Sequence, residues 1–129
     1  MYTKKLTMLV VITVISLLSL VTLGGRQAMA QLVVDTDGDG VADELDQCPV
    51  SNLSSTVVID GCDSGVSNTL FQTGCTISDV IAQCAVNAKN HGKYVSCVAR
   101  QTNSLKRSKI ITGRQKGAIQ SCAAQANIP

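Results

Sequence analysis

The segment with the most evident chemistry is DTDGDGVADELDQCP, residues 35–49, which carries six acidic side chains within twelve residues. Counted from Asp35 as position 1, aspartates occupy positions 1, 3, 5, 9 and 12, and a glycine occupies position 6. This order is typical of a twelve-residue calcium loop, because calcium takes about six to eight oxygens and alternate side chains of a sharply turning loop converge on one centre. The predicted calcium ligands are the carboxylates of Asp35, Asp37, Asp39, Asp43 and Asp46 and the backbone carbonyl of Val41.

Two departures from that pattern bear on the kind of site. Position 12 is Asp46, one methylene shorter than the usual glutamate, so bidentate closure is less favourable. The flanking residues QLVV and QCP show no helical periodicity. A helix-loop-helix sensor that opens on binding is therefore disfavoured, and we expect the sixth acid, Glu44, to face water. The alternative is a solvated acidic linker.

The same segment resembles a thrombospondin type 3 repeat, whose pattern is aspartates at alternate positions, then Asp-Gly, then spaced aspartates leading to a cysteine. The adjoining CPVSNLSSTVVIDGC resembles the linker of bacterial outer-membrane proteins that carry such repeats, in which the two cysteines are bridged. This resemblance covers residues 35–62 and implies structural calcium held by the aspartates. In the other half, AKNHGKYVSCV and ITGRQKGAIQSCAA resemble segments of small exported bacterial proteins, a likeness that implies no chemistry.

An export signal is predicted at residues 1–30, because its three parts occur in order. Two lysines form the basic start, Leu6 to Leu23 the apolar centre, and Ala28-Met29-Ala30 a small-x-small cleavage site. Cleavage after Ala30 implies a mature chain in the periplasm, at the cell surface or in the medium of a bacterium. The alternative is an uncleaved anchor, since an apolar run of 18 residues nearly spans a bilayer.

The charges beyond the signal are sorted along the chain. All nine acidic residues lie between Asp35 and Asp79, and every basic residue after the predicted cleavage site lies between Lys89 and Lys116. Five bases form a basic patch, which we define as Lys106, Arg107, Lys109, Arg114 and Lys116. This patch is suited to an anionic lipid, a polysaccharide or an acidic partner protein, whereas the lack of stacking aromatics disfavours nucleic acid. The alternatives are a solvated basic face and contact with the acidic segment of a second copy.

Six cysteines in a small exported chain predict three disulfides. Cys84 and Cys97 are equally distant from a predicted turn near residues 90–91, so an antiparallel helix pair brings them level. Cys48 and Cys62 would close a 15-residue loop, a bridge worth roughly 3 kcal/mol in the chain-entropy model. The predicted pairs are therefore Cys84–Cys97, Cys48–Cys62 and Cys75–Cys122, with Cys84–Cys122 as the alternative for the last.

The hydrophobic pattern predicts a small, disulfide-rich and mainly α fold. Residues 31–62 form the expected calcium-loop module, with one strand-like alternation from Thr56 to Ile59, and residues 63–75 a linker. Residues 76–129 are expected to form a disulfide-braced three-helix bundle. Its first helix starts at Thr76 with a stripe of Ile77, Val80, Ile81, Cys84, Ala85 and Ala88, the second runs from about Lys93 to Lys106, and the third starts near Thr112.

No motif for catalysis or zinc binding is evident in the sequence. His91 lies in an Asn-His-Gly segment with no acidic neighbour to orient it, so a turn histidine is the simpler interpretation. The cysteines lack the two-residue spacing typical of zinc ligands, and neither a Gly-rich phosphate loop nor a serine-nucleophile motif occurs. The sequence thus predicts an exported, non-enzymatic calcium-binding protein with a structural or interaction role. Its alternative is envelope binding through the basic patch.

Overall fold

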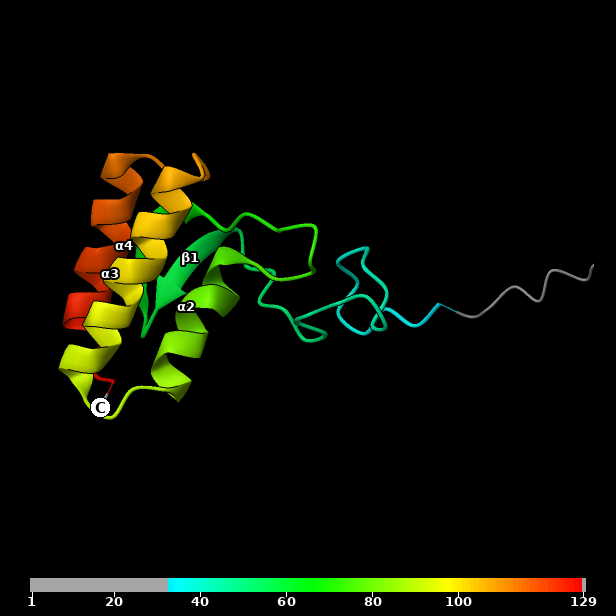
Figure 1. Cartoon of the computed structure of the whole chain (residues 1–129), viewed down its shortest axis with the longest axis horizontal. Helices are drawn as coiled ribbons and strands as arrows, with labels where there is room; N and C mark the ends of the chain where they lie inside the picture. Colours follow the sequence, from blue (N-terminus) through cyan, green and yellow to red (C-terminus); the bar gives the residue numbers. More distant parts are fainter. Residues whose placement is uncertain (1–32, 129) are drawn as a thin grey trace, which may run out of the picture. The chain divides into compact units, whose positions relative to one another are not determined.

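Two strands and three helices follow an irregular loop in the computed structural model, which describes residues 33–128 (Figure 1). The elements are β1 (Thr56–Ile59), β2 (Cys62–Ser67), α2 (Ile77–Val86), α3 (His91–Arg107) and α4 (Gly113–Gln125). The predicted export signal and its cleavage site lie outside the described residues. Among residues 33–128, no helix has the length and hydropathy needed to cross a membrane. The structure is disulfide-rich and partly helical, as predicted, and it also contains a β-hairpin.

The start of α2 is fixed by a capping box at Thr76, where the sequence predicts a helix to begin. The Thr76 side chain accepts a hydrogen bond from Asp79 N, and the Asp79 carboxylate accepts one from Thr76 N at 2.7 Å. These bonds satisfy amide groups that have no partner within the helix. Ile77, Ile81 and Cys84 of the predicted stripe are buried. The stripe therefore faces the core as expected.

Asn90 and Thr112 cap the other two helices. The Asn90 side chain accepts a hydrogen bond from Lys93 N at 3.0 Å, so α3 begins at His91, slightly before the predicted start. The Asn-His-Gly segment, whose composition is typical of a turn, is thus the cap and first turn of a helix. Thr112 forms a capping box with Gln115, and α4 begins where the sequence predicts it.

The hairpin of β1 and β2 lies partly where the sequence predicts a linker. The strands are antiparallel, with Ile59 opposite Cys62, and the intervening Asp60 and Gly61 have positive φ, at 48° and 79°. A two-residue turn of this kind matches the twist of the strands. The sequence of β2, CDSGVS, is not typical of a strand. The strand is held by its backbone hydrogen bonds to β1 and by one buried apolar side chain, Val66. The predicted linker is therefore a strand in its first part.

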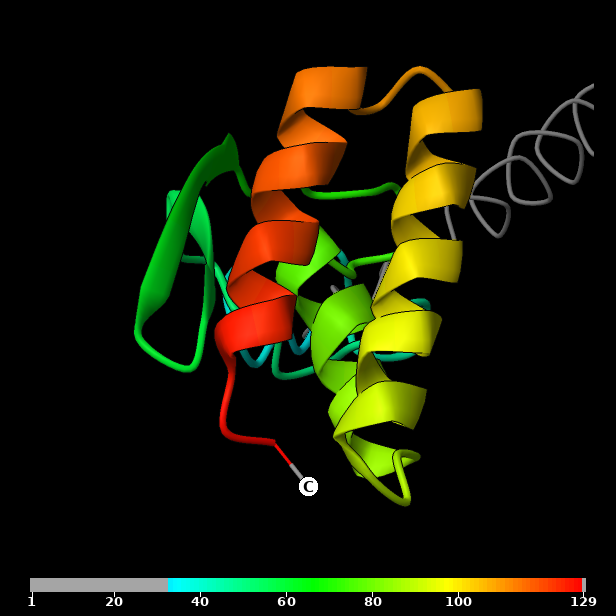
Figure 2. The same ribbon diagram turned by 90° about the vertical axis from the view of Figure 1, so that its left-hand side faces the viewer.

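The hairpin and the helices share one hydrophobic core, so the three-helix bundle predicted for residues 76–129 is incomplete without the hairpin. α4 lies between the hairpin and α3, while α2 packs against α3 and β1 (Figure 2). The apolar side chains with 2 % exposure or less are Val57, Val66, Ile77, Ile81, Tyr94, Val98, Ile119 and Ala123. The strand side chains among them cover a face of α4 that the helices alone would leave in water.

Three disulfides brace this structure, and one predicted pair is confirmed. Cys84–Cys97 joins α2 to α3, with the two Cα atoms 5.6 Å apart. The predicted pairs Cys48–Cys62 and Cys75–Cys122 are wrong, and so is the alternative Cys84–Cys122. The structure joins Cys48 to Cys75 and Cys62 to Cys122.

The position of the hairpin explains this exchange of partners. Cys62 is the first residue of β2, and the packing of β2 on α4 brings it to Cys122, at a Cα separation of 5.5 Å. Cys75 lies just before α2 and beside Cys48, at a Cα separation of 5.0 Å. Chain entropy sets the free energy of a bridge once it forms, but the geometry of the Cβ atoms decides which cysteines meet.

Candidate functional site

Three of the predicted calcium ligands converge in the acidic loop, which we define as residues 35–46. One carboxylate oxygen each from Asp35, Asp37 and Asp39 lies within 4.8 Å of the other two. The loop turns sharply between these residues, because Gly38 and Gly40 have positive φ, at 75° and 94°, a conformation that glycine adopts without steric cost. Calcium lies about 2.3–2.6 Å from its oxygen ligands, so a single ion can bridge three oxygens at this separation.

Backbone amides orient these three carboxylates. Asp35 accepts hydrogen bonds from two amides of the loop, at 2.8 and 3.0 Å. Asp37 accepts from Asp39 N at 3.2 Å and from Ser51 N at 2.6 Å. Each carboxylate oxygen carries two lone pairs, so an oxygen that accepts one hydrogen bond can still bind a cation. The hydrogen bonds therefore position the ligands without using up their capacity.

Asp39 carries an oxygen that lacks a partner. Its Oδ1 accepts a hydrogen bond from Val41 N at 2.7 Å, whereas its Oδ2 is buried and has no hydrogen-bond partner. A buried carboxylate oxygen without a partner costs about 1–3 kcal/mol or more. A cation between the three aspartates would supply the missing interaction. Val41, the predicted carbonyl ligand, is half-buried at this point of the loop.

Asp43, also a predicted ligand, does not join the converging group. Its two carboxylate oxygens accept hydrogen bonds from Thr36 N at 2.8 Å and Thr36 Oγ1 at 2.7 Å. The side chain and then the backbone N–H of Thr36 hold the pKa of Asp43 below its ordinary value, against a smaller opposing effect of desolvation. Asp43 N also donates to Val34 O at 2.9 Å. In this structure Asp43 closes the loop on its own N-terminal segment.

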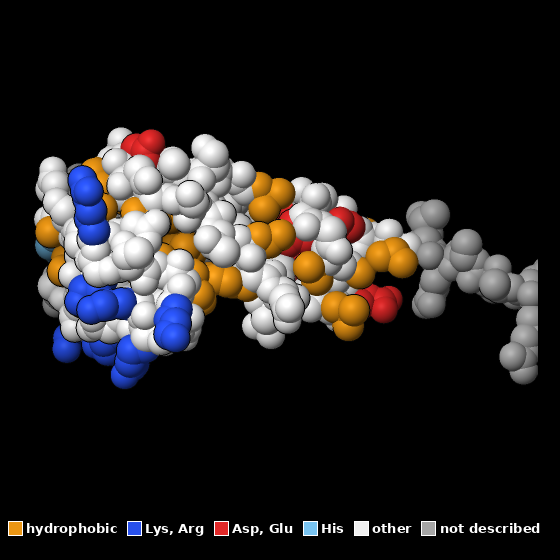
Figure 3. Space-filling view, turned by 90° about the horizontal axis from the view of Figure 1, so that it is seen from above, with side chains coloured by type: hydrophobic (Ala, Val, Ile, Leu, Met, Phe, Trp, Pro, Cys, Tyr) orange, Lys and Arg blue, Asp and Glu red, His pale blue; other side chains and the backbone are white. Residues whose placement is uncertain are grey.

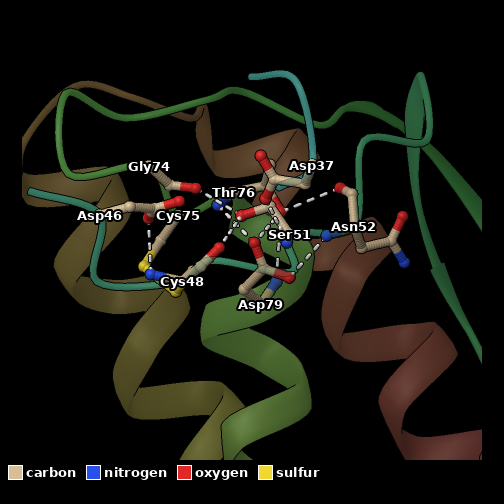
Figure 4. The surroundings of a disulfide bond; sticks show 9 residues. All are labelled: Asp37, Asp46, Cys48, Ser51, Asn52, Gly74, Cys75, Thr76 and Asp79. Carbon is tan, nitrogen blue, oxygen red and sulfur yellow. Dashed lines mark hydrogen bonds between the residues drawn. A yellow bond between two sulfur atoms is a disulfide. The ribbon is translucent and has the colours of Figure 1, made fainter. Parts of the chain in front are cut away.

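Asp46 likewise lies outside the converging group and sits beside Gly74 and the Cys48–Cys75 disulfide (Figure 4). Its Oδ1 accepts a hydrogen bond from Cys48 N at 2.7 Å, and its Oδ2 is buried without a partner. Two predicted ligands, Asp39 and Asp46, therefore each present an unpartnered buried oxygen. Glu44 is exposed, as the sequence predicts.

Ser51 connects the acidic loop to the rest of the molecule, a role that the sequence does not reveal. Its N–H donates to the Asp37 carboxylate, and its hydroxyl lies within hydrogen-bonding distance of the carbonyl oxygens of Gly74 and Cys48 (Figure 4). A serine after Cys-Pro-Val is not a recognisable local signal, because its contacts with Asp37 and Gly74 are made to residues distant in the sequence. The position of Asp37 thus depends on the segment between the loop and β1.

Asp79 serves both α2 and the segment that follows the acidic loop. Besides its capping role, its Oδ1 accepts a hydrogen bond from Asn52 N at 2.9 Å. Partial burial is the largest single influence and raises the pKa of Asp79, but hydrogen bonds from Asn52, Thr76 and Ser51 together outweigh it and leave the pKa below its ordinary value. The sequence identifies Asp79 as a first-turn acid but gives no sign of its bond to Asn52.

The basic patch belongs to α3, α4 and the turn between them. Four of its five cations are exposed, and Lys116 is half-buried, with its Nζ donating to Asn103 Oδ1 at 2.8 Å. Within residues 33–128 no lysine or arginine forms a salt bridge with a carboxylate. Figure 3 shows the Lys and Arg side chains gathered at the helical end, away from the acidic side chains of the loop. The acidic loop and the lysines and arginines are therefore separated in space as well as along the sequence, while a further acidic group lies at the helical end (Figure 3).

His91 has a structural role in the first turn of α3. Its Nδ1 lies 3.3 Å from Ile128 O, and its Nε2 lies 3.2 Å from Ala124 O. The ring therefore links the start of α3 to the end of α4 and to the residues that follow it. Both ring nitrogens lie near backbone carbonyls, and a neutral imidazole can donate to only one of them at a time.

Comparison of the chain with protein-family models, with curated proteins and with solved structures finds no match.

Proposed function

We propose that the chain is an exported, non-enzymatic calcium-binding protein in which calcium rigidifies the acidic loop beside a helical contact domain. The observation that carries this proposal is the convergence of Asp35, Asp37 and Asp39 around a buried Asp39 Oδ2 that has no partner. Three carboxylates at such a separation repel one another unless a cation balances them. The buried oxygen supplies a second reason for a cation at the same place.

The donor set favours calcium over other metals. All the predicted ligands are oxygens, which hard cations prefer, and the loop contributes no histidine or thiolate. The remaining ligands would come from the Val41 carbonyl and from Asp43 and Asp46, whose carboxylates lie elsewhere along the loop in this structure. Calcium accepts irregular coordination, whereas magnesium demands a near-ideal octahedron. The resemblance of residues 35–62 to a thrombospondin type 3 repeat supports the same ion.

The three disulfides indicate an oxidising environment, because thiols stay reduced in the cytosol. This agrees with the predicted export of the chain. We place the protein in the periplasm, at the cell surface or in the medium, where calcium is available to a site of modest affinity.

Calorimetric titration and thermal melting of the oxidised protein test the proposal. Ligand that binds the folded state alone stabilises it by about 2.7 kcal/mol at a hundredfold excess over the dissociation constant. The melting midpoint should rise with millimolar calcium, fall on addition of a chelator, and change little with magnesium. Absence of binding heat together with an unchanged melting midpoint would contradict calcium binding by the acidic loop.

A second candidate function is the binding of an anionic envelope component through the basic patch. The observation that favours it is that the cations of this patch have no carboxylate partner within residues 33–128, so their charge is available to another molecule. Replacing Lys106, Arg107 and Lys109 by alanine should weaken retention on heparin or anionic lipid. Unaltered retention of this variant would exclude the patch as the contact surface.

A further inference from the structure

A cationic ridge, which we define as Lys93, Arg100 and Arg107, runs along the exposed side of α3. Seven residues are close to two helical turns, so residues at this spacing share one side of a helix and follow one another at about 10 Å. All three side chains are exposed, whereas Tyr94 and Val98 of the same helix are buried on the opposite side. From its first to its last cation the ridge spans about 21 Å.

The ridge keeps its full positive charge. The α3 sequence HGKYVSCVARQTNSLKR contains no acidic residue, and Arg100 Nη1 donates instead to the neutral Ser96 Oγ at 3.1 Å. Lys93 lies in the first turn of α3, where the helix dipole disfavours a cation. A cation at that position costs the isolated helix a few tenths of a kcal/mol, and nothing within residues 33–128 offsets this through an ion pair.

Two surface hollows lie along the ridge. One, of about 300 Å³, is lined by Lys89, Lys93 and Arg100 together with Asn87, Ala88 and the Cys84–Cys97 disulfide. The other, of about 320 Å³, is lined by Asn103, Lys106 and Arg107. Each hollow thus brings at least two cations together, one toward each end of the helix. Negative groups placed at intervals along an extended ligand could occupy both at once.

We propose that the cationic ridge binds a linear acidic polysaccharide laid along α3. Between the cations the exposed side chains are Ser96, Asn103 and Ser104, whose hydroxyl and amide groups suit sugar hydroxyls. No large apolar side chain of α3 is exposed, which disfavours insertion into a bilayer, and the row offers no aromatic ring for stacking nucleic-acid bases. The inference rests on the second candidate function, since it names the ligand and extends the surface to Lys93 and Arg100; it is independent of calcium.

Binding of size-fractionated heparin and polygalacturonate to the oxidised protein, with calcium absent, tests this inference. Heparin carries sulfate groups in addition to carboxylates, whereas polygalacturonate carries carboxylates alone, so the two probes show whether sulfate is required. K93Q/R100Q should weaken binding at least tenfold and flatten the salt dependence of the affinity by roughly one to two units on a log–log plot. K109Q/R114Q, which removes the same charge from the part of the basic patch outside the ridge, should also weaken binding, but by less than K93Q/R100Q does. Oligosaccharides much shorter than about 21 Å should bind more weakly than longer ones.

Each other result overturns the inference. Equal losses for the two double variants mean that binding is diffuse over the basic surface. Stronger ridge-dependent retention on phosphatidylglycerol vesicles than on either polysaccharide means that the ligand is lipid. If none of these probes binds, both the ridge and the basic patch are excluded as binding surfaces. Calcium titration of the same samples still reports separately on the acidic loop. Both substituted pairs are exposed, so both variants should fold like the wild type. Their melting midpoints check this.

Discussion

Gly74 lies against the carboxylate of Asp46: a Cβ placed at position 74 would come within 1.9 Å of Asp46 Oδ1 and 2.3 Å of Asp46 Cγ. Gly74 also has a φ of 79°, which side chains with a Cβ rarely adopt. Asp46 cannot easily move aside, because its Oδ1 accepts a hydrogen bond from Cys48 N and Cys48 is bonded to Cys75. The acidic loop and the start of α2 therefore fit together only with glycine at position 74.

Gly74→Ala should lower the free energy of unfolding by about 2 kcal/mol or more, since it combines backbone strain with a steric clash. Denaturant unfolding of the oxidised protein measures the effect. Removing the Asp46 side chain as well should recover part of the loss, because the clash then disappears and only the strain remains.

Gly117→Ala is the matched control for that substitution. Gly117 lies within α4, and a Cβ added there meets nothing within 4 Å. Alanine has the higher helix propensity, so this variant should gain about 0.5–1 kcal/mol. If Gly74→Ala were as stable as Gly117→Ala, the close contact between Gly74 and Asp46 would be refuted.

The Cys48–Cys75 bridge should influence calcium binding more than the other two bridges do. Replacing both cysteines by serine removes a cross-link over 27 residues, worth roughly 3–4 kcal/mol in the chain-entropy model. It also frees the segment that holds Ser51 against Asp37. Calcium affinity measured by calorimetry should fall severalfold for this variant, since the ligands would no longer be held in place before binding.

The matched control for the bridge is Cys84→Ser with Cys97→Ser, which unlinks α2 from α3 and leaves the Cys48–Cys75 link intact. This variant should lose stability but keep calcium affinity at temperatures where it remains folded. Non-reducing peptide mapping of the native protein accompanies the experiment and should recover Cys48 linked to Cys75. Recovery of Cys48 linked to Cys62 would contradict the pairing on which the prediction depends.

The features that the sequence predicts well are local. Thr76 and Thr112 each precede a helical segment and bond to an amide three residues away, so the signal and the structure occupy the same few positions. The Cys84–Cys97 pair follows from two helices joined by a short turn. Alternate aspartates likewise converge because the glycines between them turn the loop.

The features that the sequence does not predict depend on packing between distant segments. Strand β2 is polar and short, and only its contact with α4 gives Val66 a buried position and brings Cys62 to Cys122. Asp46 is a predicted ligand by its position in the loop, yet its contact with Gly74 comes from a segment well beyond the loop. Neither contact is indicated by the spacing of the residues near it.

Asp39→Asn tests the unpartnered oxygen at the centre of the acidic loop. An amide keeps the shape of the side chain but supplies a neutral, weaker ligand, so the calcium-induced rise in the melting midpoint should be largely lost. Without calcium the variant should be as stable as the wild type or more so, because one of three converging charges is gone. Glu44→Gln removes the same charge from an exposed position and should retain the full response to calcium. Equal calcium responses for the two variants would place the ion elsewhere.

The stability of the protein should fall in acid because of Asp79. Its pKa in the folded protein is below the ordinary value, so folding favours its carboxylate form. A group of this kind stabilises the fold fully above its unfolded pKa of about 3.9, and the contribution is lost as the pH falls through that value toward the lower folded pKa. The free energy of unfolding, measured with chelator present so that calcium does not contribute, should therefore begin to fall near pH 4.

Asp79→Ala separates this effect from acid unfolding by other carboxylates. The variant loses the capping box with Thr76 and the bond from Asn52 N, so it should be about 1 kcal/mol less stable at pH 7. Its free energy of unfolding should also depend less on pH between about 2 and 5, because the group responsible for part of the slope is absent. A variant that loses stability at pH 7 but keeps the wild-type slope in acid would show that Asp79 acts as a cap without being the acid-sensitive group.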